Sequence, residues 1–257
     1  MMQNRLHPPL FTTQPVNAAL SGQLARRWLN SQDSELEAVK EEIVLGVTLH
    51  DSGWMEWDQH PLPEPESGLP YDFMNTPTGE HLALWKKTVE RARSLPPLAE
   101  WLILVHHGYL AGIHDSKGDT EEEGAAVQTF YEVSEKRWNK LAGYMDRHDF
   151  YQHYVTETGL EKLRRLMLLW DYLSLLLCMD FEETKQIPQV PVDGDWEVLN
   201  LQKRNGSYVV EPWPFAEDSI ITRIPTYRLT PSSGRKELHE QFLNSHIENR
   251  AISLQRF

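Results

Sequence analysis

The chain has 257 residues, a formal net charge of −13, 40% hydrophobic residues and nine tryptophans. This length suits one large domain or a domain with an appendage, and the composition is that of a folded globular protein. The acidic charge argues against a nucleic-acid polymer or a membrane surface as partner, because both favour clustered lysine and arginine. A small phosphorylated substrate stays compatible with it, since a bound metal ion can reverse the local field.

The sequence favours a soluble, cytoplasmic protein, either a monomer or an oligomer. Cys178 is its one cysteine, so no disulfide can form within the chain. The first residues lack an apolar core of signal-peptide length. The longest apolar stretch, 166–179, is interrupted by Asp171 and is shorter than the roughly 18–20 residues that a membrane span needs.

Up to about Thr184 the spacing of apolar residues is mostly that of helices. Two segments rich in proline, glycine or acidic residues, 58–77 and 112–124, are expected to be loops that frame a pocket entrance. Helices are predicted over 17–29, 34–50, 77–96, 97–110, 123–148 and 157–181.

Beyond residue 187 the pattern changes to alternation of apolar and polar residues. The stretch 187–195, with two prolines and a glycine, is expected to be a linker, and Asn205-Gly206 between alternating runs predicts a hairpin. A third strand is predicted over 220–229 and a helix over 234–249. The predicted fold is mostly α: a helical domain over 1–186 with a small antiparallel β appendage over 187–257.

Ionisable residues stand inside the most apolar segments. His50-Asp51 follows EEIVLGVTL, His106-His107 follows WLILV, and Asp171 lies inside LRRLMLLWDYLSLLLCM. A polar group buried without a partner costs roughly 2–7 kcal/mol. A shared metal ion is the simplest partner for all of them. Imidazole and carboxylate ligands suit Fe, Mn, Zn or Ni without distinguishing among these metals.

Each of these residues also has an ordinary structural explanation. His50 and Asp51 could form a hydrogen-bonded pair that closes a helix. Asp171 could instead form a buried ion pair with Arg164, Arg165 or an arginine distant in the sequence.

Among the other histidines, three are candidates for the site and six are expected to be exposed. One of His106 and His107 should face the site, because adjacent helical residues diverge by about 100°. His81 is either a ligand or a half-exposed helical residue. Six others lie in polar or loop contexts and are expected to be exposed: His60, His114, His148, His153, His239 and His246.

The His50-Asp51-Ser52-Gly53 run resembles the signature of the HD-domain superfamily of metal-dependent phosphohydrolases. The order His50-Asp51, His81, His106-His107, Asp171 is similar to that of its two-metal branch, which includes cyclic-dinucleotide phosphodiesterases. The resemblance implies an HD-like helical bundle that hydrolyses a phosphate ester or nucleotide. It implies His50, Asp51 and His81 as catalytic residues, with a metal bound by His50, Asp51, His81, His106, His107 and Asp171.

The whole chain more closely resembles an uncharacterised family of HD-like bacterial and archaeal proteins. The resembling segments span nearly its full length: TTQPVNAALSGQLA, LHDSGWMEWD, YDF with the following EHLALW, LLWDYLSLLLC and VVEPWPF.

The sequence departs from the superfamily at two positions. Asn17 stands where the first metal-binding histidine is expected, and an amide oxygen is a weak ligand. Trp54 replaces a lysine that often follows the signature. Two other functions therefore stay open: a degenerate HD fold that binds a ligand or partner without catalysis, and an HD-fold di-iron oxygenase.

Overall fold

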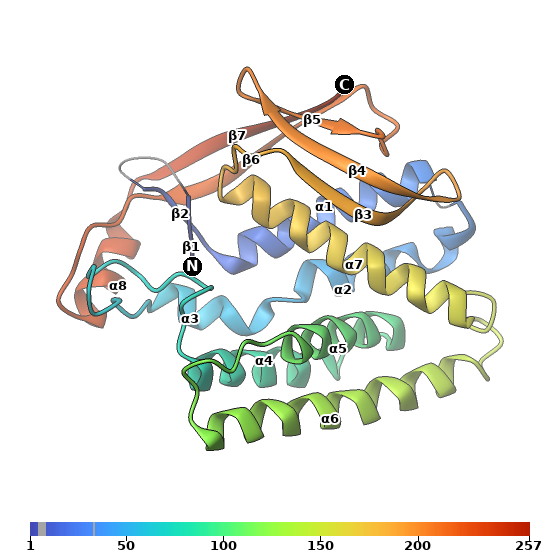
Figure 1. The fold of residues 1–257 in the computed structure, drawn as a ribbon, viewed down its shortest axis with the longest axis horizontal. Coiled ribbons are helices and arrows are strands. Elements are labelled where there is room, and N and C mark those ends of the chain that lie inside the picture. Colours follow the sequence, from blue (N-terminus) through green and yellow to red (C-terminus); the bar gives the residue numbers. More distant parts are fainter. Residues whose placement is uncertain (5–8, 33) are drawn as a thin grey trace.

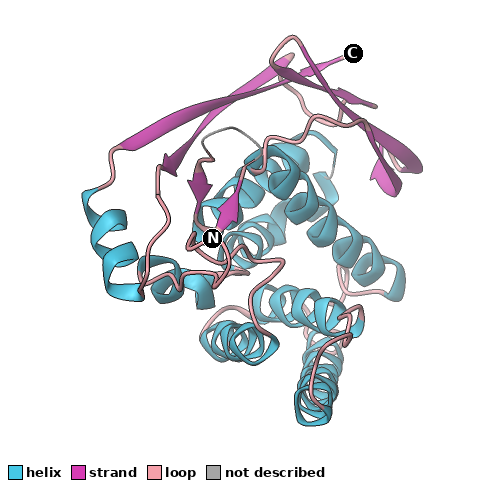
Figure 2. Cartoon of the chain, turned by 60° about the vertical axis from the view of Figure 1, so that its left-hand side comes forward, coloured by secondary structure: helices cyan, strands magenta, loops and turns pink. Residues whose placement is uncertain are grey.

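The computed structural model describes residues 1–4, 9–32 and 34–257, which form a layer of helices covered on one side by a curled sheet (Figures 1 and 2). The helices are α1 (Gln14–Gln32), the 3-10 helix η1 (Ser34–Val39), α2 (Lys40–Leu49), the 3-10 helix η2 (Ser52–Trp54), α3 (Met55–Gln59), α4 (Thr78–Ala92), α5 (Pro97–Gly112), α6 (Glu121–Met145), α7 (Glu157–Cys178) and α8 (Arg235–Asn244).

Seven strands of the described chain form one mixed sheet in the order β1-β2-β6-β7-β5-β4-β3. The pairs are antiparallel except for β5 and β7, which run parallel. The strands are β1 (Met2–Gln3), β2 (Phe11–Thr12), β3 (Lys185–Val192), β4 (Asp195–Arg204), β5 (Ser207–Glu211), β6 (Ser219–Tyr227) and β7 (Ile247–Arg256).

The prediction of a mostly α-helical, HD-domain-like bundle with a small antiparallel β appendage is wrong. About 52% of the described residues are helical and 19% lie in strands, and the sheet extends across the helical layer. The sheet is mixed, and it includes two strands from the beginning of the chain. The pairing of β2 with β6 joins the two segments predicted as separate domains, 1–186 and 187–257. That division stays a prediction.

Three parts of the sheet were not predicted from the sequence, each for a physical reason. Most of the predicted linker belongs to β3. Its prolines are tolerated because β3 is an edge strand of the sheet. The end of the predicted helix 234–249 belongs to β7, where the half-buried Glu248 and Arg250 alternate with exposed residues. Strands β1 and β2 have two residues each, too short to show any period.

Most of the predicted helices appear within a few residues of their expected limits, but the first part of the predicted helix 34–50 is the 3-10 helix η1. Helix α6 begins with a capping box, in which the Thr120 side chain accepts from the Glu123 backbone N–H at 3.2 Å. Helix α4 begins one residue later than predicted, because Pro77 is its N-cap. The predicted hairpin joins β4 to β5, with Asn205 and Gly206 both at positive φ.

Helices α1 and α7 lie between the sheet and the rest of the helical layer (Figure 1). Helix α7 contacts β3, and α1 contacts β6. Helices α2 and α5 pack beneath them, and α6 covers the far side of α5. No helix in the described ranges combines the length and the apolar character needed to cross a membrane.

Candidate metal centre

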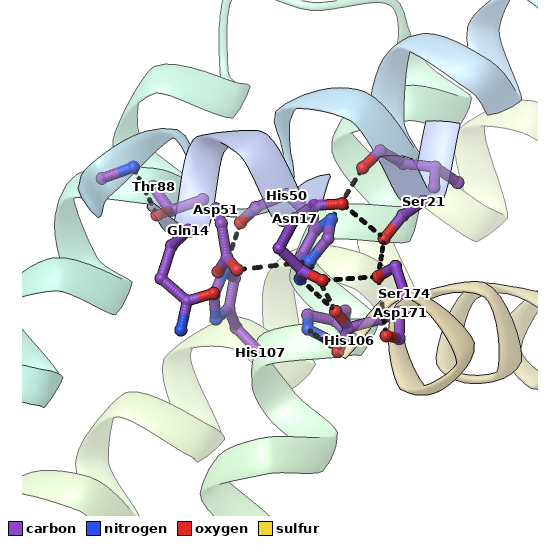
Figure 3. A network of polar contacts seen from close by, with 12 residues as sticks. Gln14, Asn17, Ser21, His50, Asp51, Thr88, His106, His107, Asp171 and Ser174 are labelled. Carbon is purple, nitrogen blue, oxygen red and sulfur yellow. Dashed lines mark hydrogen bonds and ion pairs between the residues drawn. The ribbon is translucent and has the colours of Figure 1, made fainter. Parts of the chain in front are cut away.

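Four helices bring the predicted site residues other than His81 together inside the helical layer (Figure 3). The apolar face of α2 is buried, so the end of this helix delivers its last residues into the interior. Helix α5 and the second half of α7 are apolar nearly all round and bring His106, His107 and Asp171 to the same place. The site residues are Asn17 on α1, His50 and Asp51 after α2, His106 and His107 on α5, and Asp171 on α7.

His50 is fully buried, and its two ring nitrogens have different partners. Nδ1 lies 2.6 Å from the Val47 carbonyl oxygen, which can only accept, so Nδ1 carries a proton. Nε2 lies 3.1 Å from Asp171 Oδ1 and 3.4 Å from Asp51 Oδ2. In a neutral imidazole this nitrogen would point a lone pair at two carboxylates. Only a second proton or a metal ion can satisfy all three groups.

His106 and Asp171 complete a compact donor set with His50. Each of the three offers a ligand atom, and these atoms lie within 4.8 Å of one another. The His106 Nε2–Asp171 Oδ2 distance is 3.7 Å. Two ligands held about 2.1 Å from an ion in tetrahedral geometry lie about 3.4 Å apart. The separations of 3.1 Å from His50 to Asp171 Oδ1 and 3.7 Å from His106 to Asp171 Oδ2 lie on either side of that value, so these donor types and separations are compatible with a small divalent metal.

The electrostatics of the set favour a positive charge at its centre. Burial lowers the pKa of His50, but the carboxylates of Asp51 and Asp171 outweigh it and hold this pKa well above its usual value. Burial also raises the pKa of Asp171, but the charge of His50 outweighs it and the pKa falls below its usual range. Desolvation and the charge of His50 lower the pKa of His106 to about 3. Its neutral imidazole therefore has a lone pair for a metal.

Asp51 and His81 face a cavity of about 600 Å³ that opens beside the donor set. His81 lies on α4 between two indoles, with its ring 5.2 Å from that of Trp54 and 4.7 Å from that of Trp85. Desolvation lowers its pKa to about 4, so it is neutral at neutral pH. We call this space the acidic cavity, because its lining carries one cation, Lys117, and the carboxylates of Asp51, Asp115, Asp119, Glu123 and Asp171.

His107 is hydrogen-bonded to the backbone of His50 rather than to the donor set. Its Nε2 donates to the backbone carbonyl of His50 at 2.8 Å, and its Nδ1 has no hydrogen-bond partner among the described residues. The backbone N–H of Gly53 donates to Thr88 Oγ1 at 2.9 Å, which ties the segment after His50 to α4. A Cβ at Gly53 would lie 2.3 Å from the Leu84 carbonyl oxygen. Glycine is therefore required for this close approach.

The sequence did not reveal how the Asp171 carboxylate is held. Asn17 Nδ2 donates to Asp171 Oδ1 at 3.0 Å, and Asn17 Oδ1 accepts from Ser174 Oγ at 2.6 Å. Ser174 Oγ also lies 2.6 Å from Ser21 Oγ (Figure 3). Asn17 thus orients Asp171 in this arrangement, with its amide oxygen occupied by Ser174. The missed signal is the helical spacing of Ser21 from Asn17 and of Ser174 from Asp171.

Other predicted alternatives are resolved by the contacts of the described residues. Arg164 and Arg165 both bind Glu161, and no ion pair joins either to Asp171. His114, expected to be exposed, is half-buried in the acidic cavity and pairs with Asp119 at 2.7 Å. Gln14 also lines this cavity. Its Oε1 is buried without a hydrogen-bond partner in the described chain, a feature that apolar patterning does not predict.

Comparison with known proteins identifies a family and leaves its function open. A family model described as "Protein of unknown function (DUF3891)" matches residues 2–231. No curated protein and no solved structure matches the chain. The match agrees with the predicted uncharacterised family and provides no support for the resemblance to the HD-domain superfamily. The chain belongs to the DUF3891 family.

Proposed function

We propose that the protein is a metal-dependent hydrolase of a phosphate ester. His50, His106 and Asp171 hold one divalent ion, with Asp51 beside it at the wall of the acidic cavity. The observation that carries the proposal is the position of His50 Nε2, which lies 3.1 and 3.4 Å from two carboxylates in a fully buried site and therefore needs a cation, a proton or a metal ion, between them.

The chemistry of the bound ion would be that of a Lewis acid, which activates a water molecule and polarises the phosphoryl oxygen. Asp51 is 8% exposed and reaches the cavity, so it can accept the proton of the attacking water. His81 is neutral and lies in the same cavity. It can donate an N–H to a phosphoryl oxygen or serve as a ligand to a second ion.

Two features support a phosphate ester as the substrate. The resemblance of His50-Asp51-Ser52-Gly53 to the signature of the HD-domain phosphohydrolases points to this class. A hydrolase site also needs room for the substrate beside the metal, and the volume of the acidic cavity, about 600 Å³, lies within the roughly 300–1,000 Å³ of small-molecule sites.

The first test is the metal content of protein purified without an affinity tag, followed by hydrolysis assays with the metal found. We expect near-stoichiometric metal in the parent, and its loss in His50→Ala and Asp171→Ala. His246→Ala is the matched control, because His246 is an exposed histidine far along the chain from the site. The assay compares p-nitrophenyl phosphate with bis-p-nitrophenyl phosphate, before and after chelation.

Two results would overturn the proposal. One is a metal-free parent whose His50→Ala and Asp171→Ala variants keep their stability, since the residues would then be structural. The fold would in that case serve as a binding module without catalysis. The other is a metal-loaded parent that releases no phosphate or alcohol from any ester of a broad panel.

An iron oxygenase is a second candidate because of one specific observation. Two histidines and one carboxylate, as in His50, His106 and Asp171, form the set that holds non-haem Fe(II) in many oxygenases. Iron in the purified protein and consumption of oxygen with an organic substrate would favour it. Zinc or manganese together with phosphoester hydrolysis would exclude it.

A further inference from the structure

The candidate metal centre lies where two cavities meet. The second, of about 450 Å³, lies between α5, α7 and β3, and we call it the apolar cavity. Five residues line both cavities, and two of them, His106 and Asp171, are candidate metal ligands. The residues that line the apolar cavity alone are Tyr109, Arg165, Leu168, Leu169, Tyr172, Ile187, Pro188, Gln189 and Val190.

The two cavities differ in charge. The acidic cavity has five carboxylates against one lysine in its lining. In the apolar cavity the charged lining residues are Asp171 and Arg165, and Arg165 is already paired with Glu161 at 2.8 Å. A ligand that reaches the metal centre therefore has a polar environment on one side and a mainly hydrocarbon environment on the other.

The wall formed by β3 has an irregular backbone at the cavity. The pairing of β3 with β4 shifts register between Ile187 and Val190, which marks a bulge, and Gln189 adopts a positive φ of 57°. Bulges and strained non-glycine residues gather at binding sites, because they direct side chains or backbone toward a ligand. Both features of β3 fall on residues that line the apolar cavity.

Large side chains stay exposed at the mouth of the same cavity. Tyr109 and Tyr172 are each 40% exposed, and Ile113 is 59% exposed. Tyr109 lies on α5, Tyr172 lies on α7 and Ile113 directly follows α5. All three line the cavity. Exposed apolar side chains that cluster at a concave site indicate binding of an apolar ligand.

We propose that the substrate is an aryl phosphoester, whose phosphoryl group lies at the metal centre and whose aromatic group fills the apolar cavity. This inference rests on the proposed function and specifies its substrate class. The phosphoryl oxygens lie at the metal ion on the side of the acidic cavity, where the ion and Lys117 offset part of the negative charge of the lining. The aromatic group lies between α5, α7 and the bulge of β3.

Three probes separate this inference from the proposed function itself. Methylphosphonate tests the metal centre alone, 2-naphthylmethanol tests the apolar cavity alone, and 2-naphthylmethylphosphonate tests both. Binding to the metal-loaded protein is measured by calorimetry, and none of the probes needs to be hydrolysed. We expect the naphthyl phosphonate to bind at least about tenfold more tightly than methylphosphonate, because burial of its ring contributes affinity.

Substitutions at Leu168 and Tyr172 test where the ring binds. Leu168 is half-buried and lines the apolar cavity alone, so Leu168→Trp should fill the cavity and remove the tenfold gain. Leu168→Met keeps the volume and should keep the gain. Leu243→Trp adds the same indole at a 65% exposed position on α8 and should change nothing. Tyr172→Ala, at an exposed position, should weaken naphthyl binding without affecting folding.

The outcomes are distinguishable. If methylphosphonate binds but the naphthyl group adds no affinity, the inference is overturned while the proposed function stands. The same holds if the affinity gained from the naphthyl group survives both Leu168→Trp and Tyr172→Ala. If naphthylmethanol binds at Leu168 but the phosphonate group adds nothing, the metal centre does not bind phosphoryl groups. Both proposals then fail, and the cavity belongs to another ligand.

Discussion

A single carboxylate, that of Asp171, depends on an arrangement of small side chains for its orientation. Ser174 donates to Asn17, Asn17 donates to Asp171, and Ser21 contacts Ser174. Asn17, Ser21 and Ser174 are fully buried, so none of these three side chains can turn to water if a partner is lost. The orientation of one candidate metal ligand is therefore fixed by residues that do not touch the metal.

Replacing Ser174 by alanine should weaken metal binding without removing a ligand. Loss of the Ser174 hydroxyl frees Asn17 to turn away from Asp171, and partners of this kind typically contribute 10–100-fold in metal affinity. Competition with a chelating dye measures the change. The control is Ser134→Ala, which removes another buried serine hydroxyl, on α6, away from the site. Equal effects in the two variants would contradict this role for Ser174.

Gly53 allows the segment after His50 to pack against α4. In Gly53→Ala the new Cβ would lie 2.3 Å from the Leu84 carbonyl oxygen and 2.5 Å from Thr88 Oγ1. We expect a loss of about 1–3 kcal/mol in unfolding free energy, as for other overpacked sites. Gly124→Ala on α6 meets nothing within 4 Å and should stabilise by about 0.4–1 kcal/mol. Urea denaturation distinguishes the two, and a neutral Gly53→Ala would show that α4 can move away.

Helix α7 and the sheet are joined by a buried cluster around Asp180. Its Oδ1 lies 2.9 Å from Lys203 Nζ on β4, 2.9 Å from the Tyr208 hydroxyl on β5 and 3.2 Å from Arg250 on β7. Arg250 also donates to the Leu177 carbonyl oxygen at the end of α7. These contacts connect the last turn of one helix to three strands, and they lie on the side of α7 that faces the sheet.

Asp180→Asn should destabilise the protein by about 2–3 kcal/mol, because Lys203 and Arg250 lose the carboxylate that balances their charges. Asparagine tolerates the positive φ of this position, so the backbone is unchanged. Glu248→Gln, which breaks an exposed pair with Arg228, should cost no more than about 1 kcal/mol. Thermal or urea unfolding compares the two.

The effect of Asp180→Asn should also depend on pH. Burial raises the pKa of Asp180, but hydrogen bonds from Lys203 and Tyr208 outweigh it, so the folded pKa is lowered. The carboxylate therefore stabilises the fold above the unfolded pKa of about 3.9, and this contribution is lost as the pH falls through the folded pKa. The gap between parent and variant should shrink below about pH 4. A gap that stays constant would contradict this account.

The helices and the proximity of four candidate site residues were largely predictable from the sequence, whereas the sheet was not. His50, Asp51, His106 and Asp171 stand out because a charge inside an apolar helix demands a partner, and the structure brings them together. Strand β7 could not be recognised, because Glu248 and Arg250 stand in its first half on the face that Ile252 and Leu254 bury in its second half, which breaks the apolar alternation. Its pairing with β5 and β6 is also decided by tertiary contacts rather than by local pattern.

At the scale of the whole molecule, one apolar core connects the helices to the sheet. A single cluster of buried side chains includes Leu24 and Trp170 from the helices and Leu199 and Leu254 from the sheet. The Trp28 ring on α1 packs edge-on against Phe215, with ring centroids 5.9 Å apart. Separation of the two segments would expose this surface to water.

We therefore expect the chain to unfold in one cooperative transition rather than as two domains. Urea unfolding followed by tryptophan fluorescence and by far-ultraviolet circular dichroism should give the same midpoint. Two separate transitions would instead support independent domains at 1–186 and 187–257. As a second measurement, residues 1–186 expressed alone should be poorly folded, since the faces of α1 and α7 would lose their cover.

The place of β7 in the sheet has a consequence for biosynthesis. This strand lies between β5 and β6, both of which leave the ribosome before it. Until residues 247–256 have been translated, the two strands have unpaired edges and the sheet is in two parts. Strand β3, which lines the apolar cavity, pairs with β4, β4 pairs with β5, and β5 pairs with β7. The single sheet that covers α1 and α7 is therefore complete only after this strand has been made.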